Sequence, residues 1–170
     1  MLGLKRGTVA LVPYCDEWPQ LFVEEQCALR AAIGHLAADI QHIGSTAVPG
    51  LPAKPILDIA VAVREARDVE SCIAPLATLG YEFLGDRCGD GDWFFAKGPD
   101  DLRTHYVHMV EVTSAAWSQW LAFRDALTND DRARDAYAAL KHRLLCDSEG
   151  NRKAYTEGKE AFIREVATRG

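Results

Sequence analysis

A single carboxylate interrupts the most apolar stretch of this 170-residue chain. It is Asp58, within the run Ile-Leu-Asp-Ile-Ala-Val-Ala-Val at residues 56–63, whose β-branched and small apolar residues are typical of a buried strand. A carboxylate left unpaired inside such a strand is strongly destabilising. We therefore expect Asp58 to pair with Lys54, Arg103 or a helix N-terminus, to bind a metal ion, or to lie at the solvated end of the strand.

The loop that leads into this strand contains groups suited to binding phosphate. Gly44 and Ser45 follow a short strand expected at residues 39–43, and Lys54 comes later in the same loop. A glycine–serine pair can present backbone N–H groups and a hydroxyl to an anion. The same pair is also common in ordinary turns, so the residues alone leave both interpretations open.

A second polar segment, residues 103–112, is predicted to be a strand. Strand alternation places His105 and Glu111 on one side and His108 on the other. Histidines and an acid can serve as metal ligands or as acid–base groups. The alternative is a hydrogen-bonded core histidine and an exposed strand end. We expect His105 and Glu111 to share the face of Asp58, and we favour His105 over His108.

The last predicted helix combines cations with an apolar stripe. Arg152, Tyr155, Lys159, Phe162 and Val166 recur at spacings of three and four residues, which places them on one side of the helix. The apolar members indicate that this side packs inward, so the two cations are expected at the mouth of a cleft. The alternative is an ordinary interhelical salt bridge.

These residues need a framework of strands and helices. A helix over residues 17–33, capped by Asp16, is predicted to precede the strand–loop–strand unit at 39–63. The elements expected after it are a helix at 66–79, strands at 81–84, 93–97 and 103–112, and helices at 114–127, 131–145 and 151–168. We interpret residues 1–112 as a mixed α/β (α+β) core and residues 113–170 as a helical part packed on it.

Composition narrows the class of protein. A net charge of −6 argues against broad nucleic-acid or anionic-membrane binding. The chain shows no stretch long and apolar enough for a membrane span and no apolar signal region after its first residues, so we expect a cytoplasmic location. Five scattered cysteines without a Cys-x-x-Cys pair favour reduced, structural thiols.

Residues 42–59, with the sequence His-Ile-Gly-Ser-Thr-Ala-Val-Pro-Gly-Leu followed by Ala-Lys-Pro-Ile-Leu-Asp-Ile, closely resemble the motif of the GrpB (UPF0157) family. Residues 103–111 and 152–163 also resemble that family. The family is in turn similar to the nucleotidyltransferase superfamily of the DNA polymerase β type. The resemblance implies a small mixed sheet flanked by helices, with a C-terminal helical part.

The resemblance also implies roles for the polar residues. Gly44 and Ser45 would hold the β- and γ-phosphates of a nucleoside triphosphate. Asp58, with Glu111 or His105, would hold Mg²⁺ and form the catalytic set. The phosphate-binding candidates are Gly44, Ser45, Lys54, Arg103, Arg152 and Lys159.

One residue departs from the superfamily pattern. Its members have two carboxylates separated by one residue on this strand, whereas position 60 is alanine here. The first hypothesis is a Mg²⁺-dependent enzyme that transfers a nucleotidyl group to a small acceptor. The second is a catalytically silent module that binds a nucleotide or a coenzyme A-like molecule, a ligand that the related segment of some dephospho-CoA kinases also suggests.

Overall fold

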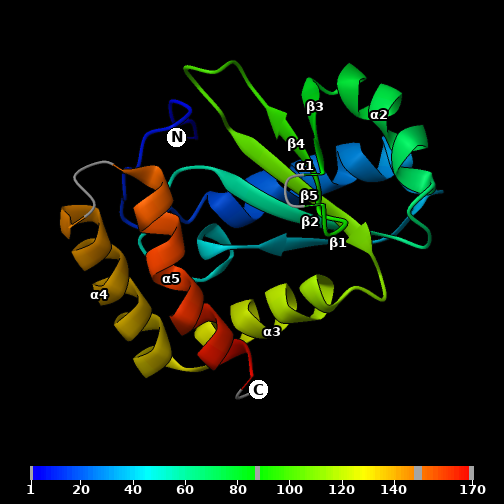
Figure 1. Ribbon diagram of the computed structural model, residues 1–170. Coiled ribbons are helices and arrows are strands. Elements are labelled where there is room, and N and C mark those ends of the chain that lie inside the picture. Colours follow the sequence, from blue (N-terminus) through cyan, green and yellow to red (C-terminus); the bar gives the residue numbers. More distant parts are fainter. Residues whose placement is uncertain (1, 87–88, 148–150, 169–170) are drawn as a thin grey trace.

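A five-stranded mixed sheet forms the centre of the protein (Figure 1). The computed structural model describes residues 2–86, 89–147 and 151–168. The strands are β1 (Ala37–Ile43), β2 (Leu57–Val63), β3 (Tyr81–Asp86), β4 (Trp93–Lys97) and β5 (His105–Glu111), in the spatial order β1-β2-β5-β4-β3. The helices are α1 (Trp18–Ile33), α2 (Asp68–Thr78), α3 (Ala115–Asn129), α4 (Asp131–Asp147) and α5 (Arg152–Ala167), and a short 3-10 helix spans Ser45–Ala47.

The sheet position of β2 explains its apolar sequence. It pairs antiparallel with β1 and parallel with β5, so both of its edges are hydrogen-bonded. Helices cover both of its faces, and every residue of β2 except Asp58 is buried. A strand enclosed on both faces needs nearly continuous apolar side chains rather than alternation.

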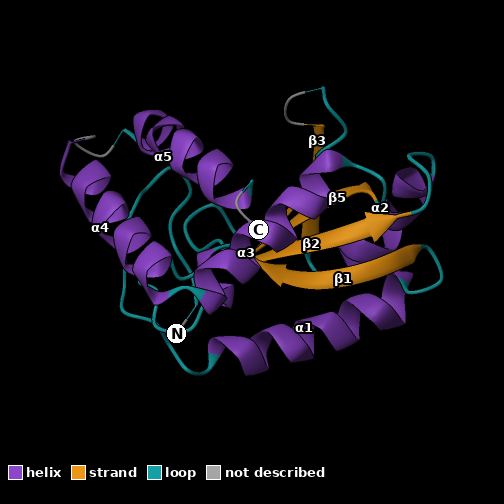
Figure 2. Cartoon of the chain, turned by 90° about the horizontal axis from the view of Figure 1, so that it is seen from below, coloured by secondary structure: helices purple, strands orange, loops and turns teal. Residues whose placement is uncertain are grey.

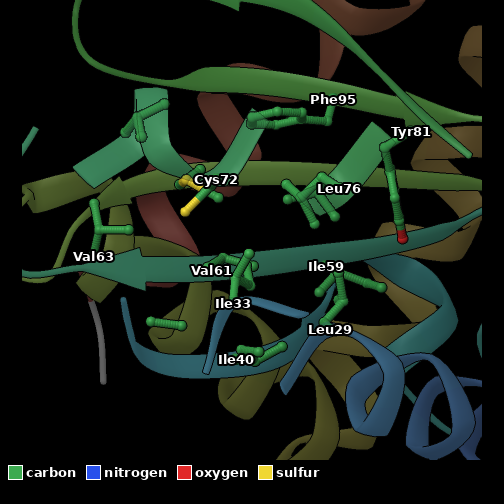
Figure 3. Close-up of a cluster of buried hydrophobic side chains, with 14 residues drawn as sticks. Leu29, Ile33, Ile40, Ile59, Val61, Val63, Cys72, Leu76, Tyr81 and Phe95 are labelled. Atoms are coloured by element: carbon green, nitrogen blue, oxygen red, sulfur yellow. The ribbon is translucent and has the colours of Figure 1, made fainter. Parts of the chain in front are cut away.

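Helices α1 and α2 cover one face of the sheet. Leu29 and Ile33 of α1 pack with Cys72 and Leu76 of α2 against Ile59, Val61 and Val63 of β2 (Figure 3). The opposite face is covered by α3, where Trp117 packs on Ala60 and Ala62. Even-numbered residues of β2, Asp58 among them, therefore face the α3 side.

The last two helices lie side by side beyond the end of the sheet where β1 ends and β2 begins (Figures 1 and 2). Tyr137 of α4, Val166 of α5 and Leu127 of α3 form an apolar cluster with Val48 and Leu51 from the β1–β2 loop. This cluster places α4 and α5 against the loop that holds Gly44 and Ser45. The division at residue 112 falls between β5 and α3 and stays a prediction.

The expected order of strands and helices is confirmed, with boundaries that differ by a few residues. The predicted cap is wrong, because α1 begins after Glu17 and no side chain caps it; Pro19 in its first turn supports the start instead. Gly80 follows α2 with φ of 86°, as expected for a residue that ends a helix. Among the described residues, no helix is long and apolar enough to cross a membrane.

Candidate functional site

A cavity of about 420 Å³ opens at the end of the sheet where α4 and α5 meet the β1–β2 loop. Gly44, Ser45, Lys54, Asp58 and Lys159 all line it. These five predicted residues come from a loop, a strand and a distant helix, and the structure brings them together. Their roles in binding stay predictions.

Close contact between Gly44 and Asp58 forms the floor of this cavity. Gly44 has φ of 69°, a left-handed conformation that side chains disfavour. A Cβ at Gly44 would lie 2.6 Å from Oδ2 of Asp58, so only glycine fits against the carboxylate. Both the backbone conformation and the lack of space therefore favour glycine at this position. Ser45 begins the 3-10 helix directly after it.

Lys141 of α4 also lines the cavity. Its side chain is buried, with the residue 2% exposed. Its Nζ donates to Ser45 Oγ at 3.1 Å and to the backbone carbonyl of Pro52. Burial, with a smaller contribution from the nearby charge of Lys159, lowers the pKa of Lys141 from 10.5 to about 7.

Lys141 belongs to the helix predicted at residues 131–145 and is not among the residues predicted for the site. The available signal was a cation at helical spacing from Tyr137 and Leu144, in a position where the neighbours point inward. Such a lysine must either be desolvated or extend to solvent. Only the packing of α4 on the β1–β2 loop shows that it is desolvated.

Two further lysines surround the Tyr155 ring of α5. The Nζ of Lys54 lies 5.1 Å from the ring centroid, and the Nζ of Lys159 lies 4.7 Å from it. Both distances are within the range of cation–π attraction. The aromatic ring therefore holds two ammonium groups beside the cavity without adding a negative charge.

Two buried tyrosines, Tyr137 of α4 and Tyr155 of α5, also line the cavity. Burial raises the pKa of Tyr155 to about 12. The pKa of Tyr137 is also raised, by burial first and then by Tyr155 and Asp58, while a hydrogen bond with Ser45 acts in the opposite direction. Both hydroxyls therefore stay protonated at neutral pH and can act as neutral hydrogen-bond donors.

The two histidines of β5 lie on opposite faces, as predicted. The expectation that His105, rather than His108, shares the face of Asp58 is wrong. Asp58 pairs with Tyr106 and Ala60 pairs with His108, and directly paired residues of parallel strands face the same way. His108 therefore shares the face of Asp58 and lines the cavity, whereas His105 does not.

His108 is held in place by its neighbours. Its Nδ1 lies 3.0 Å from the nearer carboxylate oxygen of Asp92, and its ring packs against Phe94 and Trp120. This arrangement fixes the ring at the wall of the cavity. Asp92, which directly precedes β4, is therefore the partner of a cavity residue.

His105 and Glu111 take structural positions on the α1–α2 face. His105 contacts Thr104 through Nδ1 at 2.9 Å and has Nε2 3.9 Å from Glu25. Burial lowers the pKa of His105 to about 4, with Glu25 opposing and Lys97 adding to the effect. Glu111 accepts a hydrogen bond from the backbone N–H of Ala66 at 2.9 Å. Neither side chain reaches Asp58.

Arg103 is also a structural residue. Its buried guanidinium donates to the carbonyl of Gly98 at 2.7 Å and to the carboxylates of Glu82 and Asp100. These contacts join the β4–β5 connection to β3, and Arg103 does not line the cavity. Its expected phosphate-binding position is therefore wrong. Arg152 begins α5, but its side chain lies outside the described part of the chain.

The residues around Asp58 do not fit a nucleotidyltransferase-type Mg²⁺ centre. Such a centre needs several oxygen ligands from protein carboxylates. Ala60 and Ala62 follow Asp58 on the same face, and β5 presents Tyr106 and His108 there instead of an acid. Among the described residues, no group of three or more His, Cys, Asp or Glu side chains is arranged to hold a metal ion.

Comparison with known proteins assigns the family. The model of the family described as GrpB protein matches residues 8–169. The chain belongs to the GrpB family. It is 36% identical over 170 residues to the glutamate-rich protein GrpB of Alkalihalophilus pseudofirmus, covering 98% of each chain. The crystal structure of GrpB from Enterococcus faecalis matches with a TM-score of 0.85 and 32% identity, over 94% of this chain and 96% of that one.

Two more distant matches place the GrpB chain in a wider context. It is 30% identical to a dephospho-CoA kinase of Mycolicibacterium paratuberculosis, covering 98% of this chain and 47% of the kinase. Cid1 poly(U) polymerase, in a structure described as having Mg and 3′-dATP bound, matches with a TM-score of 0.57 and 15% identity over 86% of this chain and 49% of that one. The second match shows that the fold is nucleotidyltransferase-like.

Proposed function

We propose that this GrpB protein binds a phosphate-bearing, nucleotide-like molecule and holds its negative charge with lysine side chains. The observation that carries the proposal is the convergence of Lys54, Lys141 and Lys159 on a cavity that also presents the Ser45 hydroxyl. Asp58 is the one carboxylate among the described lining residues. Lysine binds phosphate as a point charge, and a poorly solvated setting strengthens the attraction.

The rest of the lining suits the non-phosphate part of such a ligand. Trp120 and Phe123 of α3 and Tyr106 of β5 give the cavity an aromatic wall. The volume of about 420 Å³ is in the range of small-molecule sites. Aromatic side chains together with lysine ammonium groups match a molecule with a planar or apolar group at one end and phosphate at the other.

The relatives support a choice of candidate ligands. The Cid1 structure holds a nucleotide, and a curated relative is named dephospho-CoA kinase. Nucleoside triphosphates and coenzyme A are therefore the ligands to test first. Both have an adenine or another base together with several phosphate charges.

Mg²⁺-dependent nucleotidyl transfer is the second candidate. The observation in its favour is that Gly44 and Ser45 lie directly against Asp58, the arrangement that the superfamily resemblance implies. Against it, Ala60 supplies no second carboxylate, and Glu111 is on the far face of the sheet. We rank the lysine-based binding module first for this reason.

Calorimetric titration tests the proposal. ATP, GTP, CTP, UTP and coenzyme A are titrated into the purified protein, each with and without Mg²⁺. We expect one of them to bind without Mg²⁺, and Lys159→Gln to weaken that binding about tenfold, since it removes a charge-assisted contact. The matched control is Lys153→Gln, which changes an exposed lysine of the same helix and should leave affinity unchanged.

Asp58→Asn separates the two candidates. In a lysine-based site, the Asp58 carboxylate repels the ligand's phosphates, so the variant should bind as tightly as the wild type or more tightly. In a Mg²⁺-dependent transferase, the same change should abolish metal-dependent binding. Loss of binding in Asp58→Asn, restricted to the titrations with Mg²⁺, would favour the transferase. Failure of all five compounds to bind would refute both candidates.

A further inference from the structure

Lys141 is buried, and no ion pair among the described residues joins its amine to a carboxylate. Its Nζ is bonded to the Ser45 hydroxyl at 3.1 Å and to the Pro52 carbonyl, and lies 4.9 Å from the centroid of the Tyr137 ring. With the residue 2% exposed, water compensates little for the missing anion. The site therefore provides polar contacts for the amine but little to balance a full positive charge.

The surroundings favour the neutral amine while the cavity is empty of anions. Burial is the larger cause and the charge of Lys159 the smaller one, and together they lower the pKa of Lys141 to about 7. A neutral amine still donates to the Pro52 carbonyl, and its lone pair can accept from the Ser45 hydroxyl. Both contacts of Nζ are therefore compatible with the unprotonated state.

A phosphate group in the cavity would change this balance. It would bring at least one negative charge next to Nζ in a poorly solvated space, where the attraction favours the ammonium form. We propose that the pocket takes up one proton at Lys141 when it binds a phosphate ligand, and that affinity falls as the pH rises above neutrality. The inference rests on the proposed function, since it requires an anionic ligand in this cavity.

Proton uptake here is a simple reaction. The proton comes from the solvent or buffer and adds to the lone pair of Nζ, with no other bond made or broken. Other titratable groups line the cavity from each element around it. They are Tyr137 of α4, Tyr155 and Lys159 of α5, Lys54 of the β1–β2 loop, Asp58 of β2, and Tyr106 and His108 of β5. His108 is the one imidazole among these described lining residues, so it is the residue to control for.

The test is calorimetry with ATP and with coenzyme A at pH 8, without Mg²⁺, in buffers of different ionisation enthalpy. At pH 8, a group of pKa about 7 is about nine-tenths unprotonated. The slope of observed enthalpy against buffer enthalpy should therefore show uptake of close to one proton. The dissociation constant should rise close to tenfold between pH 8 and pH 9.

Two variants assign the proton to a residue. Lys141→Arg keeps a permanent charge at the position, so it should bind without proton uptake. His108→Gln should bind with the uptake unchanged, and this control applies whether or not the arginine variant folds. Uptake that persists in Lys141→Arg or disappears in His108→Gln would overturn the assignment.

The wild-type titration separates failure of the inference from failure of the proposed function. Binding of ATP or coenzyme A with no proton uptake and no pH dependence would overturn the inference and leave the proposed function standing. If neither ATP nor coenzyme A binds, the same test is made with whichever of GTP, CTP and UTP does bind, and failure of all five compounds to bind at any pH would remove both. Binding with uptake of about one proton would support both.

Discussion

Replacing Lys141 by methionine should stabilise the ligand-free protein at neutral pH. Methionine keeps a similar unbranched shape and removes the charge that the cavity does not balance. A pKa lowered from 10.5 to about 7 corresponds to a cost of about 4 to 5 kcal/mol for the charged side chain, at about 1.4 kcal/mol for each pKa unit. This cost reduces the stability of the wild type at pH 7 and below.

The change also removes the contacts of Nζ with Ser45 and Pro52. Leaving the Pro52 carbonyl unpaired costs on the order of 1 to 2 kcal/mol. The net expectation is that Lys141→Met is about 2 to 3 kcal/mol more stable than the wild type at pH 7, because the desolvated charge costs more than the lost hydrogen bonds.

The pH dependence of the unfolding free energy is the sharper test. The contributions of all other titratable groups cancel in the difference between the variant and the wild type. Between pH 7 and 10.5, the unfolded chain binds a proton at Lys141 that the folded chain does not, so wild-type stability from this group rises with pH. From pH 7 to 9 the rise is about 2 kcal/mol. The advantage of Lys141→Met should therefore shrink by that amount over the same interval.

Urea unfolding followed by tryptophan fluorescence at pH 7, 8 and 9 measures both quantities. The control is Lys153→Met, which changes an exposed lysine on α5, and its difference from the wild type should not vary with pH. A difference between Lys141→Met and the wild type that stays constant from pH 7 to 9 would refute the reasoning. It would mean that burial does not suppress the charge of Lys141.

Two further substitutions test the cavity floor and the opposite face of the sheet. Gly44→Ala should lower stability by about 1 to 2 kcal/mol through its left-handed backbone and displace the Asp58 carboxylate, so urea unfolding and nucleotide titration should both show a loss. An unchanged affinity would argue against a ligand close to Gly44. Glu25→Gln should destabilise the fold by about 2 kcal/mol, because the half-buried Lys97 loses its carboxylate partner at 2.8 Å. Ligand affinity should not change in Glu25→Gln, and a large effect there would indicate that the two faces are coupled.

Local sequence was enough to predict the strand–loop–strand unit and its neighbours. The apolar run of β2 indicates a strand buried on both faces. Gly44 can lie close to Asp58 because it has no side chain. Long elements with strong periodicity, such as α1 and α5, were predicted to within a few residues. Capping was less predictable: Asp16 is a preferred N-cap residue type, yet α1 begins after Glu17 and no side chain caps it.

The faces of β5 show what local sequence could not settle. Alternation correctly separated His105 and Glu111 from His108. It could not say which set faces Asp58, since that depends on the register between two strands that are distant in sequence. A shift of one residue exchanges the two sets, and the observed pairing of Asp58 with Tyr106 turns His108 toward the cavity.

The sequence by itself determined the motif from Gly44 to Asp58, the order of the elements and the family to which the chain belongs. The tertiary structure alone decided the electrostatic character of the site. Lys141 lies 96 residues from Ser45 in the chain, and its low pKa arises from burial between α4 and the β1–β2 loop. Desolvation depends on what surrounds a group in space, so no pattern within one helix could reveal it.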